Sequence, residues 1–314
     1  MSVTTPRQTR TTASVAAARG PSLKKTERRE ALAGALMVAP SVLLLIVFFF
    51  IPVGLAFLLA FTNARLISPS ISFTGLDNFT RLFQDPLFWK SLRNTLYFAV
   101  VVVPLQSAFA LLLALLVNEK IRGTNFFRIM YFVPVVTSIV VVSILWQFMY
   151  QPDGLVNNVL QSLSFNVLQG TDWLNNPAAA MPAIIVMSIW QAVGFHMIIW
   201  LSGLQTISPD LYEAADLDGA SRWEQFRYVT WPGLRNTRTF ILVTITIAAL
   251  SLFAQINIMT KGGPLDATTT VVFQAFRVGY QQQQTAYASA ISLVFFVLVL
   301  AVSLVQRYLT REKD

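Results

Sequence analysis

The chain has 314 residues, of which 55% are hydrophobic and only 12% are charged, and it contains no cysteine. A soluble domain carries about twice this share of charged residues, so the composition indicates one membrane domain with a short tail. The lack of cysteine excludes disulfides and thiolate metal sites. The formal net charge of +8 would suit a nucleic-acid-binding protein, but the positions of the basic residues indicate membrane topology instead.

Residues 1–30 form a basic, polar tail ahead of the first apolar segment. They include seven Lys or Arg residues and only two acidic ones, Glu27 and Glu30, and they show no sustained apolar period. This composition predicts a disordered tail. A transit peptide would also be rich in Arg and Ser, but nothing resembling a mature soluble domain follows.

Six long apolar segments come next, at approximately residues 31–61, 95–117, 129–150, 180–204, 240–260 and 286–305. Each has the roughly 20 residues that an α-helix needs to cross the hydrocarbon layer. Helices are expected because the backbone must satisfy its own hydrogen bonds in lipid. The first segment is too long for the apolar region of a signal peptide. We therefore predict an all-α, polytopic membrane protein with six transmembrane helices in one domain over residues 31–314.

Basic residues are distributed unequally between the two sets of loops. Seventeen Lys or Arg residues lie in the two terminal tails and in the loops after the second and fourth segments, against six in the opposite loops. The loop 151–179 has none. The positive-inside rule places the first set, and therefore both termini, in the cytoplasm.

Charged groups are nearly absent from the centres of the apolar segments. The only histidine, His196, lies in the fourth segment, where a neutral side chain facing other helices is a simpler interpretation than a proton relay. The lack of intramembrane acids and bases argues against a proton- or sodium-coupled carrier and against a membrane-embedded enzyme. The chain also lacks a Gly-x-x-x-x-Gly-Lys-Ser/Thr loop, so any ATP that drives transport must bind to another subunit.

The polar stretch 208–234, between the fourth and fifth segments, predicts two short helices joined at Gly219. Its first residue is a serine that can cap the first helix, and Gly219 accepts the left-handed conformation that often ends a helix. Ser221 and Glu224 have the spacing of a capping box at the start of the second helix. Pro232 is expected to end that helix or to bend it.

The first of these helices presents Glu213 beside Ala214 and Ala215. Small residues allow a partner to approach closely, and one carboxylate offers an ion pair. The predicted topology puts this surface in the cytoplasm, where a cytosolic protein could bind it. An amphipathic loop that rests on the membrane surface is the alternative interpretation.

The same stretch resembles the EAA signature of permease subunits of binding-protein-dependent ABC importers, through Glu213-Ala214-Ala215, then Gly219 and Pro232. The fuller run from Glu213 is similar to the sugar-type branch. Residues 75–79 resemble the GLDNF segment of that family, residues 172–177 its outer WLxxP segment, and residues 260–264 its TxGGP turn. Together these motifs resemble the first of the two permease subunits in maltose- or glycerol-phosphate-type systems, over residues 33–306.

The resemblance implies a transporter subunit of the bacterial inner membrane with no covalent chemistry of its own. It implies a heterodimer with a second permease, two ATPase subunits that hold the ATP and magnesium, and an extracytoplasmic solute-binding protein. The expected solute is a carbohydrate, with glycerol phosphate or another polyol as the alternative, and a channel or scaffold subunit as a remote one. The residues expected to couple to the ATPase are Glu213, Ala214, Ala215, Asp218, Gly219, Trp223 and Pro232.

The family resemblance places the solute path on the fourth and fifth segments, near Ser188, Ala192, Phe195, Ala248, Ala249 and Leu252. Several of these residues are Ala or Leu, which departs from a polar sugar site. Nearby polar candidates are Gln191, Ser251, Gln255 and Asn257, and the rings of Trp190 and Phe195 could stack on a sugar. Packing between helices is the alternative role for each of them.

Overall fold

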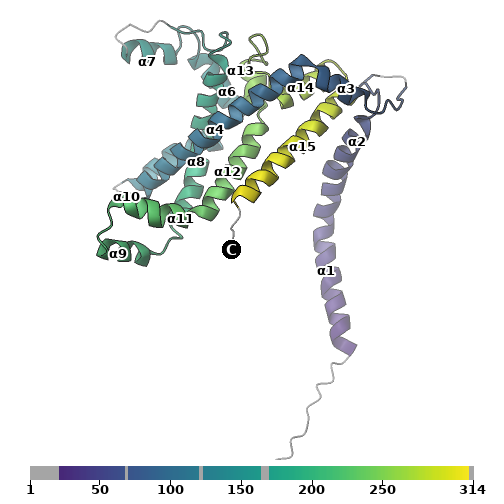
Figure 1. Ribbon diagram of the computed structural model, residues 1–314. Coiled ribbons are helices and arrows are strands. Elements are labelled where there is room, and N and C mark those ends of the chain that lie inside the picture. Colours follow the sequence, from purple (N-terminus) through teal and green to yellow (C-terminus); the bar gives the residue numbers. More distant parts are fainter. Residues whose placement is uncertain (1–20, 68–69, 120–122, 164–169, 311–314) are drawn as a thin grey trace, which may run out of the picture. The chain divides into compact units, whose positions relative to one another are not determined.

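The computed structural model describes residues 21–67, 70–119, 123–163 and 170–310 (Figure 1). In these ranges the regular structure is helical, and no strand is formed. The chain divides into two compact units at Leu55, and each is described by itself.

The unit before residue 56 is one long helical segment. It consists of α1 (Pro21–Leu45), a π-helical turn (Ile46–Phe50) and the first half of α2 (Ile51–Leu59). The apolar stretch Glu30–Leu59 has a mean hydropathy of 3.1, which confirms the first predicted span. The prediction of disorder up to residue 30 is corrected for residues 21–30, which belong to α1; Pro21 is its first residue, a position that suits proline. The rest of that predicted tail, residues 1–20, lies outside the described residues.

Four long spans belong to the second unit. They are α4 (Pro86–Asn118), α8 (Ala180–Leu204), α12 (Arg235–Leu250) with α13 (Ala254–Met259), and α15 (Thr285–Thr310). Each is long and apolar enough to cross a bilayer, as the second, fourth, fifth and sixth segments predicted.

The third predicted span is wrong as a continuous helix. It consists of α5 (Thr124–Val136) and α6 (Ile139–Met149), which meet at an angle of 97°. Pro134 lies three residues before the break and has no N–H to continue the helical ladder. With 13 and 11 residues, the two helices reach only about 20 and 17 Å, so neither crosses the bilayer alone.

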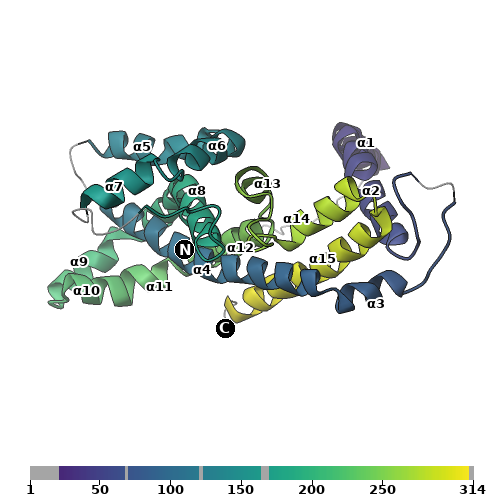
Figure 2. The same cartoon turned by 90° about the horizontal axis from the view of Figure 1, so that it is seen from above.

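The core forms where α4 packs against α8 and α12, and α12 in turn packs against α15 (Figure 2). α8 is apolar nearly all round, and side chains such as Met187, Met197 and Trp200 are buried between its neighbours. A buried polar pair joins Gln106 of α4 to His196 of α8, at 2.9 Å between Nε2 and Nδ1. His196 therefore faces other helices, as predicted.

The two ends of the second unit carry different elements. One end holds α9 (Pro209–Leu217), α10 (Arg222–Gln225), a π-helical turn (Phe226–Thr230) and α11 (Trp231–Gly233), together with the end of α15 (Figure 1). The other end holds α3 (Asp77–Gln84), α7 (Leu155–Leu163), α14 (Val271–Phe276) and its π-helical extension (Arg277–Gln281). The predicted topology requires this separation, because it assigns the first group to the cytoplasm.

Candidate functional site

The segment 208–234, called here the α9–α11 hairpin, has the helix caps that its sequence predicts. The Ser208 hydroxyl accepts a hydrogen bond from the N–H of Asp210 at 3.3 Å and so caps α9. Gly219 has a φ of +76°, in the left-handed region. The second helix ends at Gly233, one residue after Pro232.

A complete capping box begins the second helix. The N–H of Ser221 donates to Oε2 of Glu224 at 2.8 Å, and the N–H of Glu224 donates back to the Ser221 hydroxyl at 3.4 Å. The Ser221 hydroxyl also donates to the same carboxylate oxygen. These bonds from the side chain and backbone of Ser221 hold the pKa of Glu224 below its usual range, so the box is formed by an ionised carboxylate at neutral pH.

Polar bonds hold the two helices of the hairpin together. The hydroxyls of Tyr212 and Thr230 lie 3.0 Å apart. The Gln225 amide donates to the carboxylate of Asp216 at 2.6 Å and to the carbonyl of Ala220 at 3.2 Å. Most of these bonds join residues before Gly219 to residues after it, so the hairpin has a fixed internal shape.

The base of the hairpin is fixed to the membrane helices. Leu234 is fully buried, and Gly233 packs so closely on Ile207 that an added Cβ would lie 2.9 Å from the Ile207 side chain. One turn back along α8, Gly203 lies against Thr237 of α12 with no room for a Cβ. A movement of the hairpin must therefore move α8 and α12 as well.

The hairpin exposes most of the residues expected to couple to an ATPase. Glu213, Ala214, Asp218, Gly219, Trp223 and Pro232 are all exposed, and Ala215 is half-buried. Several large apolar or aromatic side chains are strongly exposed here, among them Leu217 at 90%, Tyr228 at 69% and Trp223 at 66%. Exposed apolar side chains grouped with charged ones are typical of a surface that binds a protein or rests on a membrane.

Three acids of this surface, Asp210, Glu213 and Asp218, have carboxylates without an ion-pair or hydrogen-bond partner among the described residues. The other two are engaged, since Asp216 accepts from Gln225 and Glu224 belongs to the capping box. Of the three unpaired acids, Glu213 lies directly before two small residues, Ala214 and Ala215.

The predicted solute-path residues do not all share one environment. On α8, Ser188 is buried and Ala192 is half-buried, while Phe195 is 46% exposed. On and after α12, the residues divide in the same way: Ala248 and Ser251 are exposed, Ala249 and Leu252 are buried, and Gln255 and Asn257 are half-buried. The buried members pack against neighbouring helices, so only part of the predicted set can face a path.

One exposed stripe runs along α8 through Phe195, Ile198 and Ser202, which recur every three to four residues on one helix face. Trp190 lies on a different face and packs its ring 5.5 Å from that of Trp146. Both rings have an accessible face, since Phe195 is 46% and Trp190 42% exposed.

Gln191 has a structural role that the sequence did not predict. Its amide donates to the carbonyl of Pro134 at 3.4 Å, and the hydroxyl of Thr137 donates to the carbonyl of Val133 at 3.1 Å. Both carbonyls lie at the end of α5, where the break leaves them without helical partners. Because Gln191 lies midway along the 25-residue span α8, the break lies deep in the membrane, where irregular backbone must be satisfied by protein.

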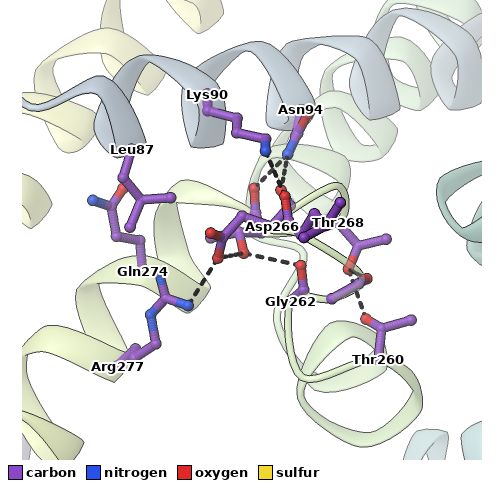
Figure 3. Close-up of polar contacts among 12 residues, drawn as sticks. Leu87, Lys90, Asn94, Thr260, Gly262, Asp266, Thr268, Gln274 and Arg277 are labelled. Atoms are coloured by element: carbon purple, nitrogen blue, oxygen red, sulfur yellow. Dashed lines mark hydrogen bonds and ion pairs between the residues drawn. The ribbon is translucent and has the colours of Figure 1, made fainter. Parts of the chain in front are cut away.

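The TxGGP segment forms a rigid turn at the opposite end of the unit (Figure 3). Thr268 bonds both to the Thr260 hydroxyl and to the carbonyl of Gly263, at 2.7 Å each. Gly262 has a φ of +85°, and the hydroxyl of Thr269 donates to its carbonyl at 3.1 Å. The threonine side chains thus satisfy the backbone of the turn.

This turn is fastened to α4 and α14. The Asn94 amide donates to the carbonyls of Asp266 and Thr269, at 3.0 Å each, and Lys90 donates to the carbonyl of Leu265. Arg277 forms an ion pair with the Asp266 carboxylate at 2.9 Å. Figure 3 shows Lys90 and Asn94 reaching from α4 to the turn.

Sequence reasoning missed Asn157, which organises the outer loop. It is 2% exposed, and its amide donates to the carbonyls of Gln151, Pro152 and Thr171. Its Oδ1 accepts from the N–H of Thr171 and from the indole of Trp173 at 2.9 Å. Trp173 was the available signal, because an indole N–H that packs into protein needs an acceptor.

Metal binding has no support in the described part of the chain, where no three His, Asp or Glu residues are grouped closely enough to hold an ion.

Comparison with protein families gives one match over most of the chain. A family described as "Binding-protein-dependent transport system inner membrane component" matches residues 106–313. This range includes the α9–α11 hairpin, the spans α8, α12 with α13, and α15, and the part of α4 from Gln106 onward.

Two curated relatives match at similar levels. The lactose transport system permease protein LacF of Rhizobium radiobacter is 36% identical over 284 residues, covering 89% of this chain and 94% of the relative. The trehalose/maltose transport system permease protein MalF of Thermococcus litoralis is 35% identical over 282 residues, covering 90% and 94%.

A solved structure has the same fold. It is a chain of a bacterial ABC transporter involved in the import of the acidic polysaccharide alginate, with a TM-score of 0.79 and 28% identity, covering 92% of this chain and 98% of that one. A second structure of the alginate transporter, in complex with an alginate pentasaccharide-bound periplasmic protein, also has a TM-score of 0.79, with 27% identity.

Proposed function

Because this chain belongs to the family of binding-protein-dependent transport system inner membrane components, we propose that it carries a carbohydrate through the membrane as one permease of an ATP-driven importer. Carbohydrate is supported by the relatives, which are named for lactose and for trehalose/maltose, and by the alginate transporter. The importer would contain a second permease, two ATPase subunits and an extracytoplasmic binding protein. ATP and magnesium would bind only to the ATPase subunits.

The observation that carries this proposal is the rigid α9–α11 hairpin, with the unpaired carboxylate of Glu213 on its surface. A cleft in an ATPase subunit can receive the two small residues beside Glu213 and pair a cation with its charge. Both termini and the hairpin would then lie in the cytoplasm, as the loop charges indicate.

The mechanism follows from how the hairpin is attached. When the ATPase subunits close on ATP, they would draw the hairpins of the two permeases together. Because the base of this hairpin is packed on α8 and α12, those helices would tilt with it and open the path to the outside. The binding protein would release its sugar into the path, and ATP hydrolysis would reverse the tilt.

Replacement of Glu213 by Lys tests the proposal. Loss of a charge from an interfacial ion pair costs about 2–5 kcal/mol, so we expect sugar uptake to fall at least tenfold and the ATPase subunits to co-purify poorly. Glu119→Lys is the matched control, because Glu119 is an exposed acid just after α4, at the same end of the unit but outside the hairpin. Normal uptake and normal ATPase retention in Glu213→Lys would refute the proposed role.

A further inference from the structure

A cavity of about 500 Å³ lies at the outer end of the second unit, away from the hairpin. Side chains of α4 between Lys90 and Tyr97 form one wall, and residues 177–182 at the start of α8 form another. Leu265 and Ala267, just after the TxGGP segment, close the third side. Two cations, Lys90 and Arg93, line this cavity, and no acidic residue does.

Both cations have donors to spare. Lys90 donates to the carbonyl of Leu265, which leaves two of its three N–H groups unused (Figure 3). Arg93 is exposed, and its guanidinium has no hydrogen-bond or ion-pair partner among the described residues. The nearest acid of the turn, Asp266, is already paired with Arg277. The cavity therefore offers a net positive charge to an anion.

The length of α4 sets the height of this cavity in the membrane. α4 has 33 residues and reaches about 50 Å, whereas the hydrocarbon layer is about 30 Å thick. If Asn118 marks the inner boundary, the outer boundary falls about 20 residues earlier, next to Tyr97. Tyrosine is typical of that boundary. Arg93 and Lys90 then lie roughly 6 and 10 Å farther out, at the level of lipid phosphates.

From the cavity toward the centre of the membrane, α4 exposes a strip of mostly apolar side chains. Tyr97, Val100 and Pro104 follow Arg93 at intervals of three to four residues, so they share its helix face. Tyr97 is 47% exposed and Val100 is 70% exposed. An anionic group in the cavity that continues into an acyl chain would fit both parts of this surface.

We propose that this cavity binds the phosphate of a phospholipid headgroup from the outer leaflet of the membrane, with an acyl chain along the exposed face of α4. Lys90 and Arg93 pair with the phosphate. The hydrogen bonds from Asn94 to the carbonyls of Asp266 and Thr269 hold the wall formed by α4 against the turn. The lipid therefore fastens the outer end of α4 to the start of α8.

The test measures how much phosphatidylglycerol the purified, assembled importer retains, by native mass spectrometry over a lipid titration. The test variant is Lys90→Gln with Arg93→Gln, which keeps polar side chains and removes both charges. The control is Arg65→Gln with Lys261→Gln, which removes two exposed charges at the same end of the unit but outside the cavity. We expect about thirtyfold weaker retention in the test variant and wild-type retention in the control.

Two results would overturn the proposal. One is equal retention of phosphatidylglycerol in wild type and the Lys90/Arg93 variant. The other is displacement of the lipid by millimolar inorganic phosphate or glucuronate, which have no acyl chain and would identify the cavity as a site for a free anion. Failure to be displaced by either competitor supports the lipid.

Discussion

The turn at Gly219 allows the α9–α11 hairpin to be tested through backbone conformation alone. Its φ is +76°, and a Cβ added to it would meet no atom within 4 Å. Gly219→Val therefore creates no clash and changes only the backbone preference. For a residue with a side chain the left-handed conformation costs about 1–2 kcal/mol, and a β-branched side chain is at the upper end. This energy lowers the ratio of docking-competent to other hairpin conformations about 5- to 30-fold.

The apparent affinity of the ATPase subunit for the permease should fall by up to this factor, because only the competent conformation binds and the affinity scales with its population. Titration of purified ATPase subunit onto the permease in nanodiscs measures it. Gly219→Asn is the control, because asparagine accepts the left-handed region. The reasoning fails if the Val and Asn variants bind the ATPase with equal affinity.

Two further predictions concern the contacts between α8 and α5. Gln191→Leu leaves the buried carbonyl of Pro134 without its donor and should lower the stability of the complex by about 1 kcal/mol, measured by thermal unfolding. Gly194→Ala places a methyl group on the carbonyl oxygen of Tyr131, an overlap that should cost about 1–3 kcal/mol or more. It should push α5 away from α8 and abolish uptake, while the ATPase subunits still co-purify.

Each of these variants has a matched control. Gln205→Leu removes the same amide at the exposed end of α8, and Gly54→Ala adds the same methyl group where no atom lies within 4 Å. Unchanged stability with a raised KM for the sugar would return Gln191 to the solute path. Normal uptake by Gly194→Ala would show that α5 can separate from α8 without consequence.

The hairpin could be predicted from sequence because its determinants are local. The capping box depends on two residues three positions apart, and the turn depends on one glycine, so no distant partner has to be known. The five long spans were likewise predictable, because about 20 apolar residues in a helix are enough to cross the hydrocarbon layer.

The break in the third span could not be predicted, because proline alone does not decide it. Pro104 lies inside α4, which continues unbroken for 33 residues, whereas α5 ends two residues after Pro134. The difference lies in tertiary contacts: Gln191 satisfies the carbonyl of Pro134, and the lack of a side chain at Gly194 lets α5 approach α8. For the same reason Gln191 was assigned to the solute path, since nothing in the sequence indicates a partner 57 positions earlier.

α8 connects the proposed ATPase-binding surface to the break between α5 and α6. At Gly203 its backbone lies directly against Thr237 of α12, next to the base of the hairpin, and at Gly194 it lies directly against the carbonyl of Tyr131 in α5. Both contacts are tight, so a displacement of α8 also displaces the helix that it touches. Packed protein interiors have low compressibility and therefore transmit such displacements. The two contacts are nine residues apart, about 14 Å along α8. A tilt imposed at the hairpin must therefore reach α5, and the break before α6 is the place where the span can bend in response.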